Sequence, residues 1–287
     1  MRGLFIGITT LDVIHYVNSG FGTNDKVSAQ ETRIHAGGLA ANAAVTFSIL
    51  GGHSRLITYA GTGALTKVIE QELSEYGVEL ENRSAGHSGG PVTASVIVNT
   101  RQGDRAVVGV KPPAEPAAPW FREPEHRPDV VLFDTYYIDT AEPYLAWACR
   151  ENIPVVLDGG SWKPGLERIL PYITYGICSQ QFYPPGCASH DQTAQYLMSF
   201  NIPWVCITRG ELPILLYGSG GEKQEIPVPS PGQVRDTLGA GDIFHGAFCF
   251  SAASGRGLEE SIKAAAQTAS QSVCCYGPRA WKDALSP

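Results

Sequence analysis

Short apolar runs that alternate with helical stretches constrain the fold of this chain most. Repeated strand–helix units of this kind favour a mostly parallel central sheet that helices cover on both faces. The expected strands are Leu4–Ile8, Leu56–Tyr59, Val130–Phe133, Val155–Leu157 and Trp204–Ile207, and the expected helices include Leu39–Leu50, Leu65–Tyr76, Gly239–Ser254 and Leu258–Cys274. The sequence therefore predicts an α/β fold.

Two segments interrupt this alternation. Val92–Asn99 and Arg105–Val110 resemble the two strands of a β-hairpin, and no helix fits between them. Lys26–His35 is polar and strand-like. We expect these segments to form a small β lid beside the main sheet, contributed by about residues 12–35 and 90–112, in a single domain that spans residues 1–287. The proline-rich stretch Lys111–Pro128 is expected to be a loop.

Composition excludes several classes of protein. The apolar share of 43% in 287 residues is enough for a core and excludes a disordered chain. The net charge of −7 leaves no basic excess for nucleic acid. No apolar run approaches the roughly 18 residues of a membrane span. The seven cysteines are scattered without a C-x-x-C pair, so we expect free thiols and a cytoplasmic protein.

The most specific motif is Asp236-Thr237-Leu238-Gly239-Ala240-Gly241-Asp242, which precedes a helical stretch. Gly239, Ala240 and Gly241 leave the backbone N–H groups of a helix start accessible, and these groups attract an anion. Asp242, in the first turn, can accept a proton from an attacking hydroxyl. An ordinary glycine-rich helix start, with an acidic residue that interacts favourably with the helix dipole, would have the same sequence pattern. The residues alone therefore leave both interpretations open.

Two further features lie near the N-terminus. Gly37 and Gly38 let a ligand approach the backbone closely, and Asn42, one turn later, can offer a donor and an acceptor to sugar hydroxyls. Asp12 follows the first expected strand, where ligands bind in open α/β sheets. Taken singly, each residue also fits a structural role.

Three rival motifs fail. A Walker A loop and a complete G-x-G-x-x-G fingerprint are both absent. Residues 86–90 match G-x-S-x-G, but Pro91 and a β-like run follow where a serine hydrolase needs a helix. The histidines, His245 included, show no metal-ligand spacing.

The chain resembles the ribokinase-like (PfkB-type) carbohydrate kinases over essentially its full length. The resemblance rests on the order and spacing of four features: the segment Gly7–Asp12, the Gly37-Gly38-x-x-x-Asn42 motif, the hairpin and the heptapeptide 236–242. The resemblance implies a three-layer α/β/α sandwich with a mostly parallel central sheet and a small β lid. It implies an ATP-dependent kinase that phosphorylates a sugar hydroxyl. The details are most similar to the ketohexokinase and sulfofructose kinase branch, which implies a ketose or ketose derivative.

The resemblance also implies roles for individual residues. Asp242 would be the catalytic base, and Gly239, Ala240 and Gly241 would form an anion hole. The substrate would contact Asp12, Gly37, Gly38 and Asn42, and Arg105 would reach the phosphates. ATP would bind Thr208 and Gly210 together with Gly239 and Gly241, and Asp236, with the Leu238 carbonyl, would hold a monovalent cation such as K⁺. Relatives also imply Mg²⁺.

One departure concerns Mg²⁺. Many relatives carry Asn-x-x-Glu where this chain has Cys178–Phe182, with neither Asn nor Glu. We therefore expect the ATP phosphates and water to hold most of the ion. For an anionic sugar, Lys111 is the obvious basic candidate, whereas Asp134 and Asp158 can either face the site or be ordinary strand-end acids.

Two alternatives to a sugar kinase stay open. A nucleoside kinase would use the same motifs, and a catalytically silent sugar-binding sensor would explain the missing Asn-x-x-Glu. Because exposed lid edges need covering, we also expect a homodimer that pairs through the lid strands. The expected partners are a small sugar and ATP, without nucleic acid or membrane.

Overall fold

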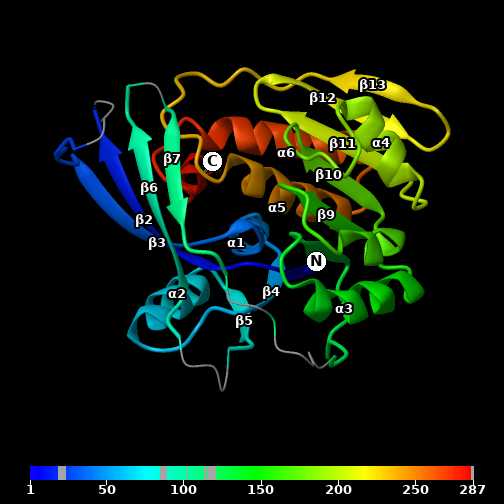
Figure 1. The fold of residues 1–287 in the computed structure, drawn as a ribbon, viewed down its shortest axis with the longest axis horizontal. Coiled ribbons are helices and arrows are strands. Elements are labelled where there is room, and N and C mark those ends of the chain that lie inside the picture. The colour runs from blue at the N-terminus through cyan, green and yellow to red at the C-terminus, as the bar shows by residue number, and fades with distance from the viewer. Residues whose placement is uncertain (19–23, 85–88, 102, 113–114, 116–120, 286–287) are drawn as a thin grey trace.

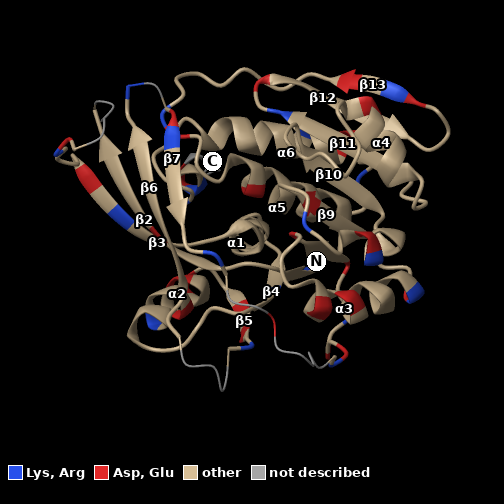
Figure 2. Cartoon of the chain, in the orientation of Figure 1, with Lys and Arg blue, Asp and Glu red and all other residues tan. Residues whose placement is uncertain are grey.

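The computed structural model describes residues 1–18, 24–84, 89–101, 103–112, 115 and 121–285. Its described part has a large sheet flanked by helices and a smaller sheet to one side (Figure 1). Figure 2 shows Lys and Arg interspersed with Asp and Glu over the outer elements. No helix among the described residues is long and apolar enough to cross a membrane.

The large sheet has the strand order β13-β12-β11-β10-β9-β8-β1-β4-β5. Its strands are β1 (Arg2–Ile6), β4 (His53–Thr58), β5 (Val78–Asn82), β8 (Val130–Phe133), β9 (Val155–Gly159), β10 (Tyr175–Ser179), β11 (Trp204–Arg209), β12 (Leu212–Gly218) and β13 (Lys223–Ile226). The pairs from β5 to β11 are parallel, and only β11–β12 and β12–β13 are antiparallel. The chain runs outward from β1 in both directions, so the carboxyl end of β1 is a topological switch point, where such sheets bind ligands.

Helices cover both faces, as expected of a three-layer α/β/α sandwich. The helices are α1 (Leu39–Ile49), α2 (Ala64–Glu75), α3 (Ile138–Arg150), α4 (His190–Met198), α5 (Ala240–Ala253) and α6 (Leu258–Ser272). Side chains alternate along β1, since Phe5 packs in the core under α1, α5 and α6 whereas Leu4 and Ile6 pack in the core under α3 and α4. Each strand thus contributes to two cores, which explains its uninterrupted apolar run.

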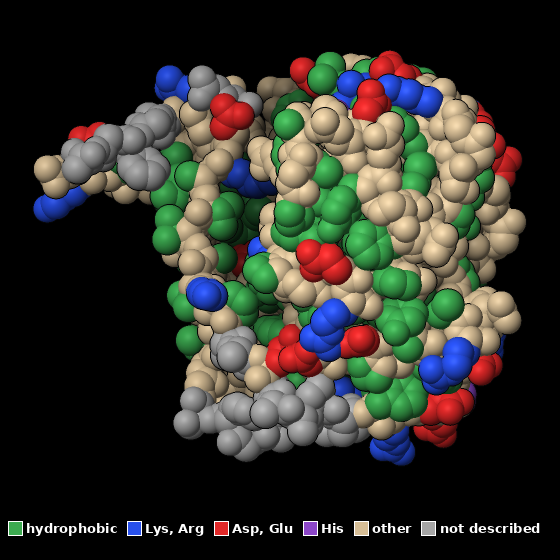
Figure 3. Space-filling view, turned by 45° about the vertical axis from the view of Figure 1, so that its right-hand side comes forward, with side chains coloured by type: hydrophobic (Ala, Val, Ile, Leu, Met, Phe, Trp, Pro, Cys, Tyr) green, Lys and Arg blue, Asp and Glu red, His purple; other side chains and the backbone are tan. Residues whose placement is uncertain are grey.

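The smaller sheet, which we call the lid sheet, has the order β3-β2-β6-β7. Its strands are β2 (Thr10–Val17), β3 (Glu31–Gly37), β6 (Val92–Asn99) and β7 (Arg105–Gly109). The molecular surface is hollowed between this sheet and the main body (Figure 3). The expected β lid beside the main sheet is therefore confirmed. The chain passes from the main sheet to the lid sheet directly after β1, where β2 begins.

Several boundaries differ from the expectation. β1 ends at Ile6 rather than Ile8, and residues 26–30 precede β3 instead of belonging to it. The pattern also did not single out β5, β10, β12 and β13, of which β5 and β13 are the edge strands of the large sheet. The central part of the G-x-S-x-G match, residues 85–88, lies outside the described residues, as do residue 102 of the hairpin turn and parts of 111–128.

Asp134, directly after β8, holds the start of α1 against the sheet. Its carboxylate accepts hydrogen bonds from the backbone N–H groups of Ile8 (2.8 Å), Ala40 (3.0 Å) and Tyr136 (3.1 Å). The side chain is fully buried, and burial raises its pKa well above the ordinary range. A Cβ on Gly7 would lie 2.0 Å from this carboxylate, so Gly7 allows the close approach. Asp134 is therefore a structural acid.

We expect Asp134→Ala to lower the free energy of unfolding by about 3 kcal/mol or more, because three buried N–H groups lose their acceptor. Asp129→Ala is the matched control, since Asp129 is exposed and accepts one backbone hydrogen bond, from Arg2. Its effect should stay within about 1 kcal/mol. Chemical denaturation measures both, and equal effects would show that Asp134 has no special structural role.

Candidate active site

Close packing of α1 on α5 creates the candidate site. A Cβ on Gly246 of α5 would lie 2.4 Å from the Ala43 carbonyl of α1, so only glycine permits this approach. The alanine-rich face of α1 is buried at the same interface. As a result, the Asn42 Nδ2 atom donates a hydrogen bond to Oδ2 of Asp242 over 2.7 Å. Two motifs 200 residues apart therefore meet.

The start of α5 has the geometry of an anion site. Gly239 caps the helix with a φ of 73°, a left-handed conformation that glycine adopts without strain. The helix itself cannot satisfy its first amides, which include those of Gly241 and Asp242. A Cβ on Gly241 would meet no atom within 4 Å, so the helix start faces open space. An anion has room to reach these amides.

The environment of Asp242 makes it a better proton acceptor than an exposed carboxylate. Burial, together with the negative charge of Asp158, raises the pKa of Asp242 to about 7. The hydrogen bond from Asn42 and the charges of His245 and Arg105 oppose this rise. A carboxyl with a pKa near neutrality can both take up and release a proton at physiological pH.

Asp158, at the end of β9, is the second buried acid near the site. Its Oδ2 atom has no hydrogen-bond partner and lies 3.5 Å from Nδ1 of His245. Burial raises the pKa of Asp158 to about 7. His245 is buried, with Nδ1 2.8 Å from the Gly241 carbonyl and Nε2 3.2 Å from that of Ile177. Asp158, unlike Asp134, therefore retains an unpaired oxygen.

The lid sheet brings Asp12 to the same region. Asp12 lies on β2 opposite His35 of β3, and its Oδ1 accepts a hydrogen bond from Thr10 over 2.6 Å. A Cβ on Gly37 would lie 2.0 Å from Oδ2 of Asp12, so the glycine makes room for the acid. Gly38, with a φ of 95°, packs against the Ile8 carbonyl and leads into α1. Asp12, the two glycines and Asn42 are thus contiguous.

Asp236 connects the lid sheet to the loop before α5. Its Oδ1 accepts from the Leu238 N–H over 2.8 Å, and its Oδ2 accepts from the Tyr16 hydroxyl at 3.0 Å and from the Gly277 N–H at 2.9 Å. Three segments that are distant in sequence converge on one buried carboxylate. Both oxygens therefore already have donors, whereas the sequence predicted a monovalent cation there.

Arg105, which the resemblance predicts to reach the phosphates, lies on β7 and contacts the loop before α5. Its guanidinium donates to the carbonyl and the hydroxyl of Thr237, at 3.1 and 2.8 Å. The Thr237 hydroxyl in turn donates to the Gly103 carbonyl of the hairpin over 3.2 Å. The hairpin is therefore held against the loop that begins α5, with one positive charge at the anion site.

This arrangement coincides with one known family. The model of the pfkB family of carbohydrate kinases matches residues 3–284. The chain belongs to this family. It is 23% identical to the ribokinase of Bacillus subtilis, over 95% of this chain and 92% of that protein. Members transfer a phosphoryl group to an alcohol, so the chain is a kinase of this class.

Solved structures show the same fold. The ribokinase of Arabidopsis thaliana, complexed with ribose and ATP, superposes with a TM-score of 0.72 at 19% identity, covering 96% of this chain and 93% of that one. The adenosine kinase of Sinorhizobium meliloti superposes with a TM-score of 0.77 at 18% identity, covering 99% and 98%. Both superpositions show that this chain shares their fold.

Thr208 and Gly210, which the resemblance assigns to ATP binding, lie at the carboxyl end of β11. The Thr208 hydroxyl donates to the Cys178 carbonyl over 3.3 Å, and a Cβ on Gly210 would meet nothing within 4 Å. In the neighbouring stretch 178–182, the Ser179 hydroxyl donates to the Gly160 carbonyl over 3.0 Å. Residues 178–182 contain no carboxylate. The neighbouring strand β9 carries the acid Asp158 near its carboxyl end.

Sequence reasoning missed three residues of the site region. Glu72 and Arg279 lie behind Asn42 and belong to no motif, and the burial of Arg279 is visible only in the structure. Lys163 lies 4.8 Å above the Tyr136 ring, so a basic residue stands near the Asp134 segment.

Proposed function

We propose that this protein is an ATP-dependent sugar kinase in which Asp242 is the catalytic base. The observation that carries the proposal is the Asp242 carboxylate, oriented by Asn42 at 2.7 Å beside the first amides of α5. Residues 1–287 would act as a single kinase domain with Arg2–Ile6 at its centre, since the family match spans 3–284. The cytoplasm is its predicted location.

The reaction needs a base and a site for charge. Asp12, Gly37, Gly38 and Asn42 would hold the sugar so that one hydroxyl faces Asp242. Asp242 takes the hydroxyl proton while the oxygen forms a bond to the γ-phosphorus of ATP and the bond to the bridging oxygen breaks, which leaves ADP. The amides of Gly239, Ala240 and Gly241, with Arg105, would stabilise the charge on the transferred group.

The residues present fit a Mg²⁺ ion that is bound mainly through ATP. No three His, Cys, Asp or Glu side chains within the described ranges are grouped to hold a metal. Asp158, whose Oδ2 has no hydrogen-bond partner, is the carboxylate best placed to complete the shell. Mg²⁺ neutralises phosphate charge when bound. K⁺ at the Asp236 loop stays a prediction, as does ATP binding by Thr208 and Gly210.

The acceptor is proposed to be a ketose or ketose derivative. We expect ADP release with a ketose in a panel of ketoses, aldoses and nucleosides supplied with ATP and Mg²⁺. Because Lys111 and Lys163 can face an anionic substituent, the panel includes phosphorylated ketoses. Turnover of adenosine alone would make the protein a nucleoside kinase, and sugar-dependent stabilisation without any ADP would make it a sensor.

Asp242→Asn should lower kcat by roughly 10²–10⁴-fold, because the amide cannot accept the hydroxyl proton. The variant should still bind sugar, since the amide keeps the shape of the side chain. Coupled measurement of ADP release gives kcat, and thermal shift with sugar gives binding. A variant that turns over within a few-fold of the wild type would refute the assignment.

The pH profile provides the control for that variant. Since the pKa of Asp242 is about 7, wild-type kcat should fall as the pH drops below about 7, where the carboxyl becomes protonated. The residual rate of Asp242→Asn should lack this acid limb. An acid limb near pH 4 in the wild type would mean that an exposed carboxylate, not Asp242, is the base.

The lid edges favour a homodimer. All five residues of β7 are exposed, and Val108 is 73% exposed. Ile34, on the opposite edge strand, is 53% exposed. Pairing of two lid sheets would cover such edges. Light scattering at micromolar concentration should give twice the monomer mass, and a monomer mass would contradict the proposal.

A further inference from the structure

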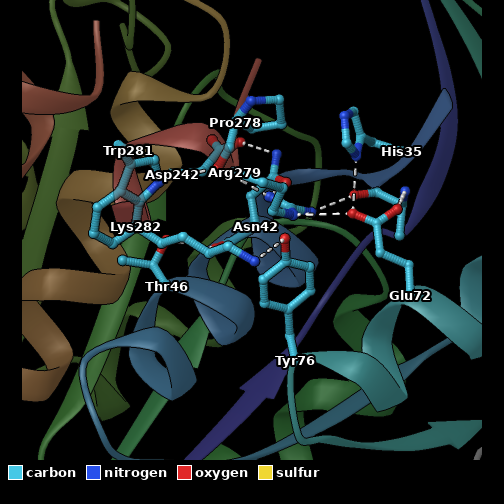
Figure 4. Close-up of polar contacts among 11 residues, drawn as sticks. His35, Asn42, Thr46, Glu72, Tyr76, Asp242, Pro278, Arg279, Trp281 and Lys282 are labelled. Atoms are coloured by element: carbon cyan, nitrogen blue, oxygen red, sulfur yellow. Dashed lines mark hydrogen bonds and ion pairs between the residues drawn. The ribbon is translucent and has the colours of Figure 1, made fainter. Parts of the chain in front are cut away.

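Arg279 is a buried arginine behind the site that the phosphoryl-transfer account does not use. Only 4% of its surface is exposed. Its guanidinium donates to the Asn42 Oδ1 atom over 2.9 Å, to Glu72 over 3.1 Å and to the Ala36 carbonyl over 2.5 Å (Figure 4). Arg279 therefore joins the residue before the two glycines, helix α2 and the amide that contacts Asp242.

The chemistry of these contacts determines how the Asn42 amide is turned. A guanidinium has only hydrogen-bond donors, so Arg279 can contact only Oδ1 of that amide. The Nδ2 group then necessarily faces Asp242, whose ionised carboxylate has only acceptors. Rotating the amide by a half turn would set its oxygen against the carboxylate and its N–H groups against the guanidinium. Both contacts would become repulsive.

Arg279 is itself held in place by Glu72. The Glu72 carboxylate accepts from the Ala36 N–H at 2.6 Å and lies 3.0 Å from Nδ1 of His35. Burial alone would raise the pKa of Glu72, but the His35 contact and the Arg279 charge outweigh it and keep the pKa below its ordinary value. Glu72 therefore stays ionised and neutralises the buried guanidinium.

We propose that Arg279 is a positioning residue, which fixes the Asn42 amide so that it donates to the catalytic base Asp242. This inference rests on the proposed function, since it needs Asp242 as base. The contacts form one chain, Glu72–Arg279–Asn42–Asp242, that crosses α2, the C-terminal segment, α1 and α5. Within it, each donor faces an acceptor, so the orientation at one end constrains the other.

The pH profile separates positioning from a purely structural role. The charged or titratable groups that influence Asp242 are Asp158 from β9, His245 from its own helix and Arg105 from β7. Asn42 contributes the hydrogen bond that lowers the pKa of Asp242. If the amide is no longer held, that hydrogen bond weakens and the pKa of Asp242 rises. The acid limb of kcat should then move to higher pH.

The first experiment compares Arg279→Met with Lys282→Met. Lys282 lies on the same segment and is exposed, and its ammonium lies 3.4 Å from the Tyr76 hydroxyl. Its removal deletes an equal positive charge. Arg279→Met should lower kcat by about 10- to 100-fold, the range for a lost hydrogen bond to a charged group, with little change in KM for ATP. Lys282→Met should stay within about two-fold.

A double-mutant cycle shows whether Arg279 acts through Asn42. In an Asn42→Ala background, Arg279→Met should cost less than about three-fold, because the amide to be positioned is absent. An undiminished loss in that background would overturn the proposal. Arg279→Lys keeps a donor and a positive charge, and should recover part of kcat and of the pH profile.

Two outcomes distinguish this inference from the proposed function. If Asp242→Asn remains active, the base assignment fails and this inference fails with it. If Asp242→Asn is inactive while Arg279→Met keeps wild-type kcat and acid limb, only the positioning role is wrong. Should Arg279→Met not fold, Glu72→Gln provides a milder release of the guanidinium, and an unchanged acid limb in that variant would also overturn the proposal.

Discussion

The contact between α1 and α5 is the constraint on which the rest of the site depends. Gly246 lets the Ala43 carbonyl approach to a distance that any side chain would prevent. Asn42 can therefore reach Asp242, and Gly239 lies close to both, since a Cβ there would be 3.7 Å from the Asn42 amide. Without this close approach, the motif at the start of α1 and the motif at the start of α5 would not meet.

The buried carboxylates of this protein have different roles, which depend on their hydrogen-bond partners. Asp134 accepts three backbone N–H groups and holds α1 on the sheet. Asp236 also accepts three donors and joins the lid sheet to the C-terminal segment. Asp158 keeps an oxygen without a partner, and Asp242 has an open approach beside Gly241. Satisfied acids stabilise the scaffold, whereas unsatisfied ones remain available for chemistry.

The lid sheet and the loop before α5 share hydrogen bonds rather than lying apart. Tyr16 of β2 reaches Asp236, and Arg105 of β7 reaches Thr237. Both contacts end on the residues that precede α5. A displacement of the lid sheet would therefore disturb the contacts of the residues that precede α5.

Local sequence determined the alternating strands and helices, the lid hairpin and the motifs around Asp12, Asn42 and Asp242, because periodicity and glycine spacing act over a few residues. The same patterns could not separate Asp134 from Asp12, since each is an acid that follows an expected strand. Nor could they indicate Glu72 or Arg279. Only the tertiary structure decided these roles, because a buried charge is defined by the partners that packing brings to it from distant segments.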